Sequence, residues 1–406
     1  MSKTCYLTGK LIFLPNTGWK TKPPYPLTLS ATDTTYTYLA KTFQGLEEVL
    51  ADELRTLGAL NVSVRRRAVL FDGDLALLYK ANLCLHTALR ILMPIYEFKA
   101  RDERQLYRGI QEVDWPRHMG ITQTFAIDST VKSDFFRHSK FVALKSKDAL
   151  VDQFRAKYRR RPSVDTQQPD QRIHIHVNQD RVRVMLDSSG ESLHRRGYRQ
   201  SGHKAPVNEV LAAGMIALSG WQGKKPLIDP MCGSGTILIE AALWASKIGP
   251  GMLRKRFGFM NWRNYDLPLF KKLKREVRKS QQPLTSSLYG VELYPPYVKL
   301  AQDTVAAAGF SDQIWVQEGD FFEMDPLAKD AVLIMNPPYG ERLEQAEIDG
   351  FYKDIGDRFK QQYKGSEAWV LSSNLAAMKR VGLKADRKIQ LFNGPLDCRF
   401  NQYKLY

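Results

Sequence analysis

A buried strand that runs into a glycine-containing turn and then into a helix most constrains the fold of this chain. Residues 227–236 read Leu-Ile-Asp-Pro-Met-Cys-Gly-Ser-Gly-Thr, and a strongly apolar run follows. Gly233 and Gly235 can adopt positive φ and let the backbone approach a ligand, while the first N–H groups of the helix have no intrahelical partner. This arrangement is typical of nucleotide-binding α/β domains, although simple packing turns can have the same form.

A second apolar segment, residues 288–292, ends in an acid. Glu292 therefore follows a strand at the place where a doubly wound sheet puts a carboxylate for a ribose diol. That acid normally follows the glycines by about 20 residues, and the gap in this chain is much longer. The sequence thus predicts an insertion over roughly residues 249–287.

A third apolar strand, residues 331–335, runs directly into Asn-Pro-Pro-Tyr at residues 336–339. The prolines fix φ and remove two N–H donors, so the Asn336 side-chain oxygen and the Pro337 carbonyl can point at one hydrogen-bond donor. An exocyclic amine is such a donor. A nicotinamide-dependent dehydrogenase would explain the glycines but not this tetrapeptide, and a plain proline turn would leave the glycines and the acid unexplained.

In these segments the chain resembles the class I S-adenosylmethionine-dependent methyltransferases that modify planar amines. The resemblance implies S-adenosylmethionine as cofactor, with its methionine end at residues 229–236, its ribose at Glu292 and its adenine at residues 319–321. The positions that the resemblance assigns to the cofactor are Asp229, Pro230, Cys232, Gly233, Ser234, Gly235, Thr236, Glu292, Asp320 and Asn336. Those that it assigns to catalysis are Asn336, Pro337, Pro338 and Tyr339. Tyr339 would stack on a base taken out of its helix.

The C-terminal half alternates strands and helices. Strands are expected over residues 226–228, 288–291, 314–317, 331–335 and 368–372, and helices over residues 207–218, 296–308 and 348–363. This alternation predicts a parallel sheet with helices on both faces, and such sheets bind ligands at the carboxyl ends of their strands. All of the motifs above fall at those ends.

The length and the charge of the chain indicate several domains and a polyanionic partner. A chain of 406 residues exceeds one compact core, so two or three domains are expected. The net charge of +17 fits nucleic acid or an anionic membrane surface. No apolar run approaches the roughly 18 residues that cross a bilayer. The cysteines Cys5, Cys84, Cys232 and Cys398 lack metal-site spacing, so neither zinc nor a disulfide framework is expected and a cytoplasmic location is the simplest.

The N-terminal half divides into three segments. Residues 1–36 are rich in proline, serine and threonine and are expected to form a poorly structured extension. Residues 37–99 show the order β-α-β-β-α-β, which predicts a small ferredoxin-like module. Residues 100–193 contain a predicted strand at 125–131 and a helix at 139–160.

The helix at residues 139–160 is amphipathic and basic. Leu144, Val151, Phe154 and Tyr158 are expected on its apolar face, and the opposite face is either a solvated surface or an RNA-binding one. The candidate RNA-binding residues in and around it are Lys132, Arg137, Lys140, Lys145, Arg159 and Arg160. Strands are expected next at residues 173–177 and 182–186, where His174 and His176 form a surface pair rather than a metal site.

The region up to Leu193-His-Arg-Arg-Gly-Tyr-Arg199 resembles a THUMP domain, the RNA-binding module that follows a ferredoxin-like domain in several RNA-modifying enzymes. Residues 37–406 are similar to the THUMP-containing methyltransferases that methylate guanosine N2 in bacterial large-subunit ribosomal RNA. The resemblance implies an α/β fold in which a Rossmann-like methyltransferase domain, residues 194–406, follows the ferredoxin-like and THUMP segments. It implies ribosomal RNA as partner and neither a metal nor a membrane, and it leaves the oligomeric state open.

Two alternatives remain on the sequence. An adenine-N6 DNA methyltransferase shares the cofactor motifs and the Asn-Pro-Pro-Tyr, but not the THUMP-like region. A non-catalytic RNA-binding assembly factor could retain the fold, although the intact motifs argue against it. The helix predicted at residues 267–279 of the insertion, with Phe270, Leu273 and Val277 inward and basic residues around them, fits an RNA-facing surface or a solvated one equally well.

Overall fold

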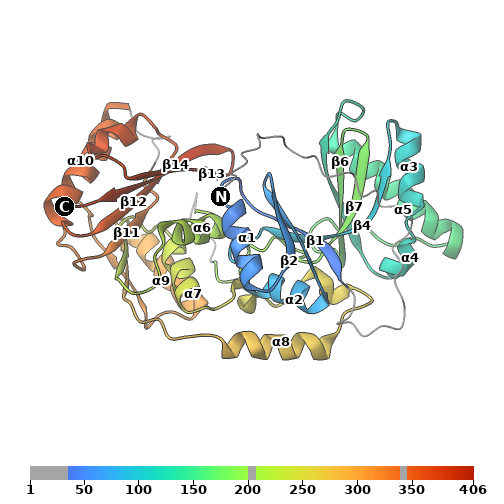
Figure 1. Ribbon diagram of the computed structural model, residues 1–406, viewed down its shortest axis with the longest axis horizontal. Coiled ribbons are helices and arrows are strands. Elements are labelled where there is room, and N and C mark those ends of the chain that lie inside the picture. The colour runs from blue at the N-terminus through green and yellow to red at the C-terminus, as the bar shows by residue number, and fades with distance from the viewer. Residues whose placement is uncertain (1–34, 200–206, 339–344) are drawn as a thin grey trace, which may run out of the picture.

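The computed structural model describes residues 35–199, 207–338 and 345–406 (Figure 1). The extension expected over residues 1–36 falls almost entirely outside this part of the chain. The described elements of the N-terminal half are β1 (Tyr36–Lys41), α1 (Glu47–Thr56), β2 (Leu60–Arg65), β3 (Ala68–Gly73), α2 (Leu75–Cys84), β4 (Arg90–Lys99), α3 (Glu103–Gln111), α4 (Trp115–His118), β5 (Phe125–Lys132), α5 (Ser139–Tyr158), β6 (Gln171–Asn178) and β7 (Arg181–Asp187). The β-α-β-β-α-β order predicted for the ferredoxin-like module is confirmed.

One seven-stranded sheet unites the ferredoxin-like and THUMP segments. Its strand order is β2-β3-β1-β4-β7-β6-β5. The long strand β4 joins them, because it pairs with β1 on one side and with β7 on the other, from Leu92 opposite Asp187 to Lys99 opposite Arg181. The two segments therefore lie as one unit rather than as two linked bodies.

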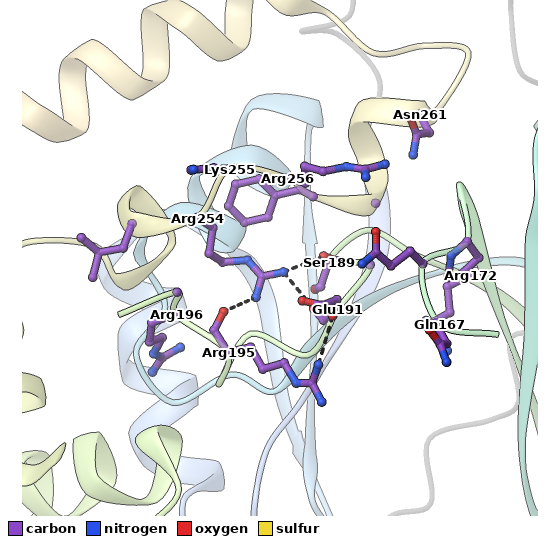
Figure 2. A pocket seen from close by; sticks show the side chains of 17 residues that line it. Gln167, Arg172, Ser189, Glu191, Arg195, Arg196, Arg254, Lys255, Arg256 and Asn261 are labelled. Carbon is purple, nitrogen blue, oxygen red and sulfur yellow. Dashed lines mark hydrogen bonds and ion pairs between the residues drawn. The ribbon is translucent and has the colours of Figure 1, made fainter. Parts of the chain in front are cut away.

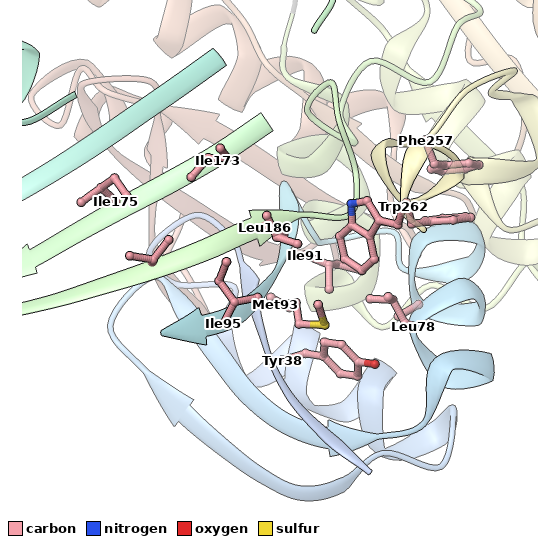
Figure 3. Close-up of a cluster of buried hydrophobic side chains, with 14 of the residues drawn as sticks. Tyr38, Leu78, Ile91, Met93, Ile95, Ile173, Ile175, Leu186, Phe257 and Trp262 are labelled. Atoms are coloured by element: carbon pink, nitrogen blue, oxygen red, sulfur yellow. The ribbon is translucent and has the colours of Figure 1, made fainter. Parts of the chain in front are cut away.

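The cores of the two segments merge across this sheet. Figure 3 shows Tyr38 and Leu78 of the ferredoxin-like segment in one cluster with Ile173 and Ile175 of β6. Ile91 on β4 lies between them and is fully buried. Burial of such aliphatic and aromatic side chains is the main favourable term in folding, so the shared core fixes the orientation of the two segments.

The C-terminal half has the predicted alternation of strands and helices. Its described elements are α6 (Glu209–Ser219), β8 (Leu227–Asp229), α7 (Thr236–Ala245), η1 (Pro250–Leu253), η2 (Gly258–Asn261), α8 (Leu267–Lys279), β9 (Leu288–Glu292), α9 (Pro295–Ala308), β10 (Ile314–Glu318), β11 (Val332–Met335), α10 (Gln345–Gln362), β12 (Glu367–Ser372), η3 (Ala377–Val381), β13 (Arg387–Asn393) and β14 (Leu396–Lys404). The expected α/β class is confirmed.

The second sheet has the strand order β10-β9-β8-β11-β12-β14-β13. Strands β10, β9, β8, β11 and β12 run parallel, so their carboxyl ends meet at one edge. The antiparallel hairpin β13–β14 extends the sheet beyond β12. In Figure 1 this sheet lies at one end of the molecule and the THUMP strands lie at the other, with the ferredoxin-like segment between them.

The insertion after α7 packs on the ferredoxin-like segment. Its residues Phe257, Phe259, Trp262, Phe270, Leu273 and Val277 belong to the core of the N-terminal half. The Phe259 ring stacks on Tyr79 of α2 at 4.5 Å between centroids, and the Asp266 N–H donates to the Tyr79 hydroxyl at 2.9 Å. A Cβ on Gly251 would lie 2.3 Å from the Asn82 carbonyl oxygen, so only glycine allows this approach. The insertion therefore holds the two halves together, a role that neither sequence interpretation of helix α8 included.

Helix α5 differs in part from its predicted amphipathic face. Val151 and Phe154 are buried as expected, but Leu144 and Tyr158 are exposed. The buried positions instead centre on Val142, Ala149 and Leu150, together with Val151 and Phe154. The helix ends two residues earlier than predicted, because Arg159 adopts the left-handed conformation at its C-cap with φ 57°. Among the described residues, we find no helix whose length and apolar character would let it cross a membrane.

Candidate cofactor and catalytic site

The glycine turn joins β8 to α7 in the way that the sequence predicts. Gly233 and Gly235 have φ of 54° and 74°, a conformation that side chains strongly disfavour. The Gly235 N–H closes the turn by donating to the Cys232 carbonyl at 2.8 Å. Helix α7 then begins at Thr236, so its free N–H groups face the edge where the parallel strands end.

Two carboxylates lie at the ends of the neighbouring strands β8 and β9. Glu292 accepts hydrogen bonds from the Gly233 N–H at 3.0 Å and from the Tyr294 N–H at 3.1 Å. Its side chain therefore ties the glycine turn to the next strand. Asp229 is buried, and its carboxylate accepts from the Met231 N–H at 3.3 Å. Pro230 and Ser234, which complete this turn, are also buried.

Burial raises the pKa of Asp229 to about 8; the Met231 N–H acts against this and the charge of Glu292 adds to it. A buried carboxyl group of this kind becomes a good partner for a cation that enters the site. The α-ammonium and sulfonium groups of S-adenosylmethionine are such cations, so the donor set fits this cofactor.

The third strand end on this edge belongs to β10. The Gly319 N–H donates to the main-chain oxygen of Glu292 at 3.1 Å, which places residues 319–321 beside the carboxylate. Asp320 turns back on its own backbone and accepts from the Phe322 N–H at 2.8 Å. Phe321 is buried against Phe359 of α10 and against Tyr363, which directly follows that helix.

The fourth strand end carries the Asn-Pro-Pro segment. Strand β11 is buried throughout and is paired with β8 and β12, so it delivers Asn336 to the same edge. Asn336 is half-buried, Pro337 is buried and Pro338 is exposed. Tyr339, the fourth residue of the motif, lies outside the described residues.

Two residues that sequence analysis missed support the Asn-Pro-Pro segment from below. The Tyr352 hydroxyl of α10 lies 3.4 Å from the Pro338 carbonyl oxygen, to which it donates. It also shares a hydrogen bond of 2.7 Å with the Ser372 hydroxyl at the end of β12. Burial raises the pKa of Tyr352 to about 12, so this phenol stays a donor at physiological pH. The signal that could have identified Tyr352 was its polar hydroxyl on the buried face of the helix predicted over residues 348–363.

Arg196 and Tyr198, in the segment before α6, form a buried connection between the two halves of the chain. Arg196 is almost fully buried and donates to the main-chain oxygens of His86 and Leu193 as well as to the Glu240 carboxylate on α7. The Tyr198 hydroxyl donates to Glu240 at 2.9 Å. Helix α7 is thereby fixed to the ferredoxin-like segment.

The candidate RNA-binding residues form two groups. Lys132, Arg137 and Lys140 are exposed near the start of α5, whereas Arg159 and Arg160 are exposed beyond its end. A helix of 20 residues spans about 30 Å, so the two groups are separate contact points. Lys145 differs from the others, because it forms an ion pair with Glu103 and lies over the Tyr107 ring.

Exposed apolar side chains accompany the first group. Phe135, Phe141 and Leu144 are 47%, 41% and 49% exposed, respectively. The Arg101 guanidinium lies 5.6 Å from the centre of the Phe135 ring. Rings that lie among cations suit unpaired bases of RNA, which stack on aromatic side chains.

Comparison with known protein families identifies the family to which this chain belongs. Residues 196–402 match the RMKL-like methyltransferase domain, residues 100–187 match the THUMP domain and residues 37–92 match the RlmL ferredoxin-like domain. The chain belongs to the RMKL-like methyltransferase family. The resemblance inferred from the motifs is therefore confirmed.

Individual relatives in this family agree. The chain is 40% identical to a putative RNA methyltransferase of Synechocystis sp., over 94% of this chain and all of the relative. It is 37% identical to the ribosomal RNA large subunit methyltransferase K/L of Syntrophotalea carbinolica, over 91% of this chain and 53% of that protein. The chain thus spans about half the length of the second relative.

A solved structure of a putative methyltransferase in complex with SAH superimposes with a TM-score of 0.82 at 30% identity. The match covers 92% of this chain and 98% of that one. The family relationship and this complex make S-adenosylmethionine the cofactor of the chain. The edge of the sheet at which the four strand ends converge is therefore the candidate site.

Proposed function

We propose that this protein transfers a methyl group from S-adenosylmethionine to the exocyclic N2 of a guanosine in large-subunit ribosomal RNA. The observation that carries the proposal is the Asn336-Pro337-Pro338 segment at the end of β11, one strand away from the glycine turn. The relationship to a large-subunit methyltransferase K/L and the THUMP domain support ribosomal RNA as the substrate.

In this proposal each strand end binds a different part of the cofactor. Asp229 and the backbone of the turn from Pro230 to Thr236, with Cys232, Gly233, Ser234 and Gly235, hold the methionine end. Glu292 accepts from the ribose hydroxyls, and Asp320 lies at the adenine. When bound, the cofactor supplies a methyl group made electrophilic by the positive sulfur.

The Asn-Pro-Pro-Tyr segment holds the acceptor nitrogen. The lone pair of a guanine N2 is delocalised into the ring, so attack requires the nitrogen to become more tetrahedral. The Asn336 side-chain oxygen and the Pro337 carbonyl would accept its two hydrogens, and the Tyr339 ring would stack on the extruded base. Pro338 and the Tyr352 hydroxyl beneath it keep this backbone in place. Most of the acceleration would come from this alignment.

The exposed basic and aromatic side chains at the two ends of α5 would bind other parts of a large RNA substrate. Lys132, Arg137 and Lys140 at one end of α5, and Arg159 and Arg160 at the other, would contact phosphates, while Phe135 and Phe141 would stack on unpaired bases. Lys145 would contribute least, because Glu103 already neutralises it.

The proposal is tested by offering the purified protein two substrates with labelled S-adenosylmethionine. One is an unmodified large-subunit ribosomal RNA transcript and the other is double-stranded DNA. Nucleoside mass spectrometry then identifies the product. N2-methylguanosine in the RNA alone is expected. N6-methyl-2′-deoxyadenosine in the DNA would establish the rival activity, and label in neither substrate, with cofactor bound, would favour a non-catalytic assembly factor.

A further inference from the structure

A concave pocket lies where three distant parts of the chain meet, away from the methyl-transfer site. It has a volume of about 350 Å³. Its walls come from the start of β6 and the residues before it, from the segment that follows β7, and from the insertion between η1 and η2 (Figure 2). The pocket therefore joins the THUMP segment to the methyltransferase half.

The lining of this pocket is strongly cationic. Arg172, Arg195, Arg254, Lys255 and Arg256 contribute positive side chains, against the single carboxylate of Glu191. Arg195 is exposed and forms an ion pair with Glu191 at 3.1 Å. Lys255 and Arg256 are exposed, and neither pairs with an acid in the part of the chain that the structure describes.

Arg254 is a fixed part of the wall rather than a mobile surface side chain. It is 8% exposed, and its two terminal nitrogens donate to the main-chain oxygens of Ser189, Glu191, Ser192 and Arg195. Its Nε is buried and has no hydrogen-bond partner among the described residues. Burial lowers the pKa of Arg254 to about 10, and the nearby Glu191 carboxylate acts against this shift.

The opposite wall of the pocket also contains an arginine whose side chain is mostly buried. Arg172 is held by Asp128 at 2.8 Å, and its Nε is likewise buried without a partner among the residues described. Because both Nε atoms are buried, the donors that an anion in the pocket could reach belong to Arg195, Lys255 and Arg256, which are exposed.

The pocket selects for a phosphate rather than for a base. The Phe257 ring at its wall is buried, with the Arg254 guanidinium 5.2 Å from its centre, so this ring offers no free face for stacking. The lining instead presents guanidinium and ammonium donors, which match phosphate oxygens. A Cβ on Gly258 would lie 2.4 Å from the Asp187 carbonyl oxygen, so only glycine keeps the two walls this close.

We propose that this junction pocket binds backbone phosphates of the substrate RNA between the THUMP contact and the methyl-transfer site. That the anion belongs to RNA rests on the proposed function, whereas the phosphate chemistry follows from the lining itself. The pocket would be a fixed anchor. It would set the distance along the RNA between the bases at α5 and the base that is methylated.

The test reverses the charge of the two exposed residues in the double variant Lys255→Glu/Arg256→Glu. The matched control is Lys329→Glu/Lys364→Glu, which makes the same change in charge at two exposed lysines near the opposite edge of the methyltransferase sheet, where β11 and β12 begin. Affinity for a large-subunit ribosomal RNA transcript is measured over a series of salt concentrations, with cofactor affinity and melting temperature in parallel. Inorganic phosphate and AMP are titrated separately by calorimetry.

The pocket variant should bind the RNA on the order of tenfold more weakly at about 0.1 M salt, and its salt slope should fall by about one to two, because two phosphate contacts are lost. The control variant should keep the wild-type slope. Equal slopes and affinities in the two variants would overturn the proposal. A calorimetric signal for AMP that only the pocket variant loses, with RNA binding intact, would also overturn it and assign the pocket to a free nucleotide.

Failure of this inference is separable from failure of the proposed function. If the wild-type protein methylates ribosomal RNA and the pocket variant binds that RNA normally, only the pocket assignment is wrong. If the pocket variant loses RNA affinity but the wild-type protein leaves the RNA unmethylated, the pocket stands and the catalytic assignment is wrong.

Discussion

The guanidinium of Arg196 pairs with the carboxylate of Glu240 inside the protein, with Nε 3.4 Å from Oε1 and side-chain exposures of 1% and 0%. The two residues connect the segment before α6 to the middle of helix α7. Arg196 also donates to the His86 carbonyl at 2.5 Å, so one side chain joins three parts of the chain. The glycine turn at the start of α7 is thereby fixed relative to the ferredoxin-like segment.

Removing one member of this pair should destabilise the protein strongly. Glu240→Ala leaves the Arg196 charge buried without a carboxylate, and such unpaired buried charges cost about 3–5 kcal/mol. Urea denaturation followed by circular dichroism measures the loss. The matched control is Glu191→Ala, which breaks the exposed pair with Arg195 and should cost less than about 1 kcal/mol. Equal losses in the two variants would show that the buried pair does not hold the halves together.

The raised pKa of Asp229 predicts how stability depends on pH. Because its folded pKa of about 8 exceeds the ordinary 3.8, the neutral carboxyl group favours the fold. This contribution is complete below about pH 4 and is lost as the pH rises through 8. Asp229→Asn removes the titration and keeps the shape. In the absence of cofactor, the variant should therefore be more stable than the wild-type protein at pH 9, by at least about 1 kcal/mol, and equal to it at pH 4.

The same substitution should weaken cofactor binding if Asp229 faces the cationic methionine end. Calorimetry of the wild-type protein at pH 7 in two buffers with different ionisation enthalpies should show that a proton is released on binding. Asp229→Asn should release none. An unchanged affinity in the variant would remove Asp229 from the cofactor site, whatever its effect on stability.

Glu292→Ala tests the ribose assignment. It removes a carboxylate that accepts from the Gly233 N–H, and the loss of charge-assisted hydrogen bonds to the ribose should weaken S-adenosylmethionine binding by about 1.5–3 kcal/mol. Glu318→Ala provides the control, since Glu318 is exposed and lies beside Glu292 in the register of β10 and β9. If both variants bind the cofactor as tightly as the wild-type protein, the ribose lies elsewhere.

The two basic ends of α5 should contribute to RNA binding independently. Arg137→Glu/Lys140→Glu and Arg159→Glu/Arg160→Glu should each reduce RNA affinity and its salt slope, and the losses in free energy should add because the sites lie about 30 Å apart. Lys145→Ala should leave affinity within about twofold, since Glu103 neutralises Lys145. Filter binding over a salt series measures all three. If Lys145→Ala weakened RNA binding more than either double variant, the assignment of RNA binding to the two ends of α5 would be wrong.

Local pattern was sufficient to predict the elements of the site. Strands β8 and β9 end at Asp229 and Glu292, and Asn336 directly follows β11. Each of these strands is a short apolar run that leads to a polar residue, and parallel pairing brings such ends together without further information. The helix over Leu267–Lys279 was likewise readable, because its apolar residues recur at helical spacing.

What the sequence did not predict depends on contacts between distant residues. The pairing of Arg196 with Glu240, 44 residues away, has no local signature. Leu144 has the right spacing for the buried face of α5, yet it is exposed, since burial depends on which face the sheet covers. The periodicity of α8 predicts a buried face but not its partner, and that partner turned out to be helix α2.

The central claim is that Asn336 holds the N2 of a guanosine for methyl transfer, and single-turnover transfer to large-subunit ribosomal RNA with nucleoside mass spectrometry tests it most directly. Asn336→Ala removes one of two acceptors, so N2-methylguanosine should form about 10²–10³ times more slowly while cofactor affinity and melting temperature stay nearly normal. Asn336→Asp keeps an acceptor and should retain more activity than the alanine variant. An alanine variant that forms N2-methylguanosine at the wild-type rate would contradict the account.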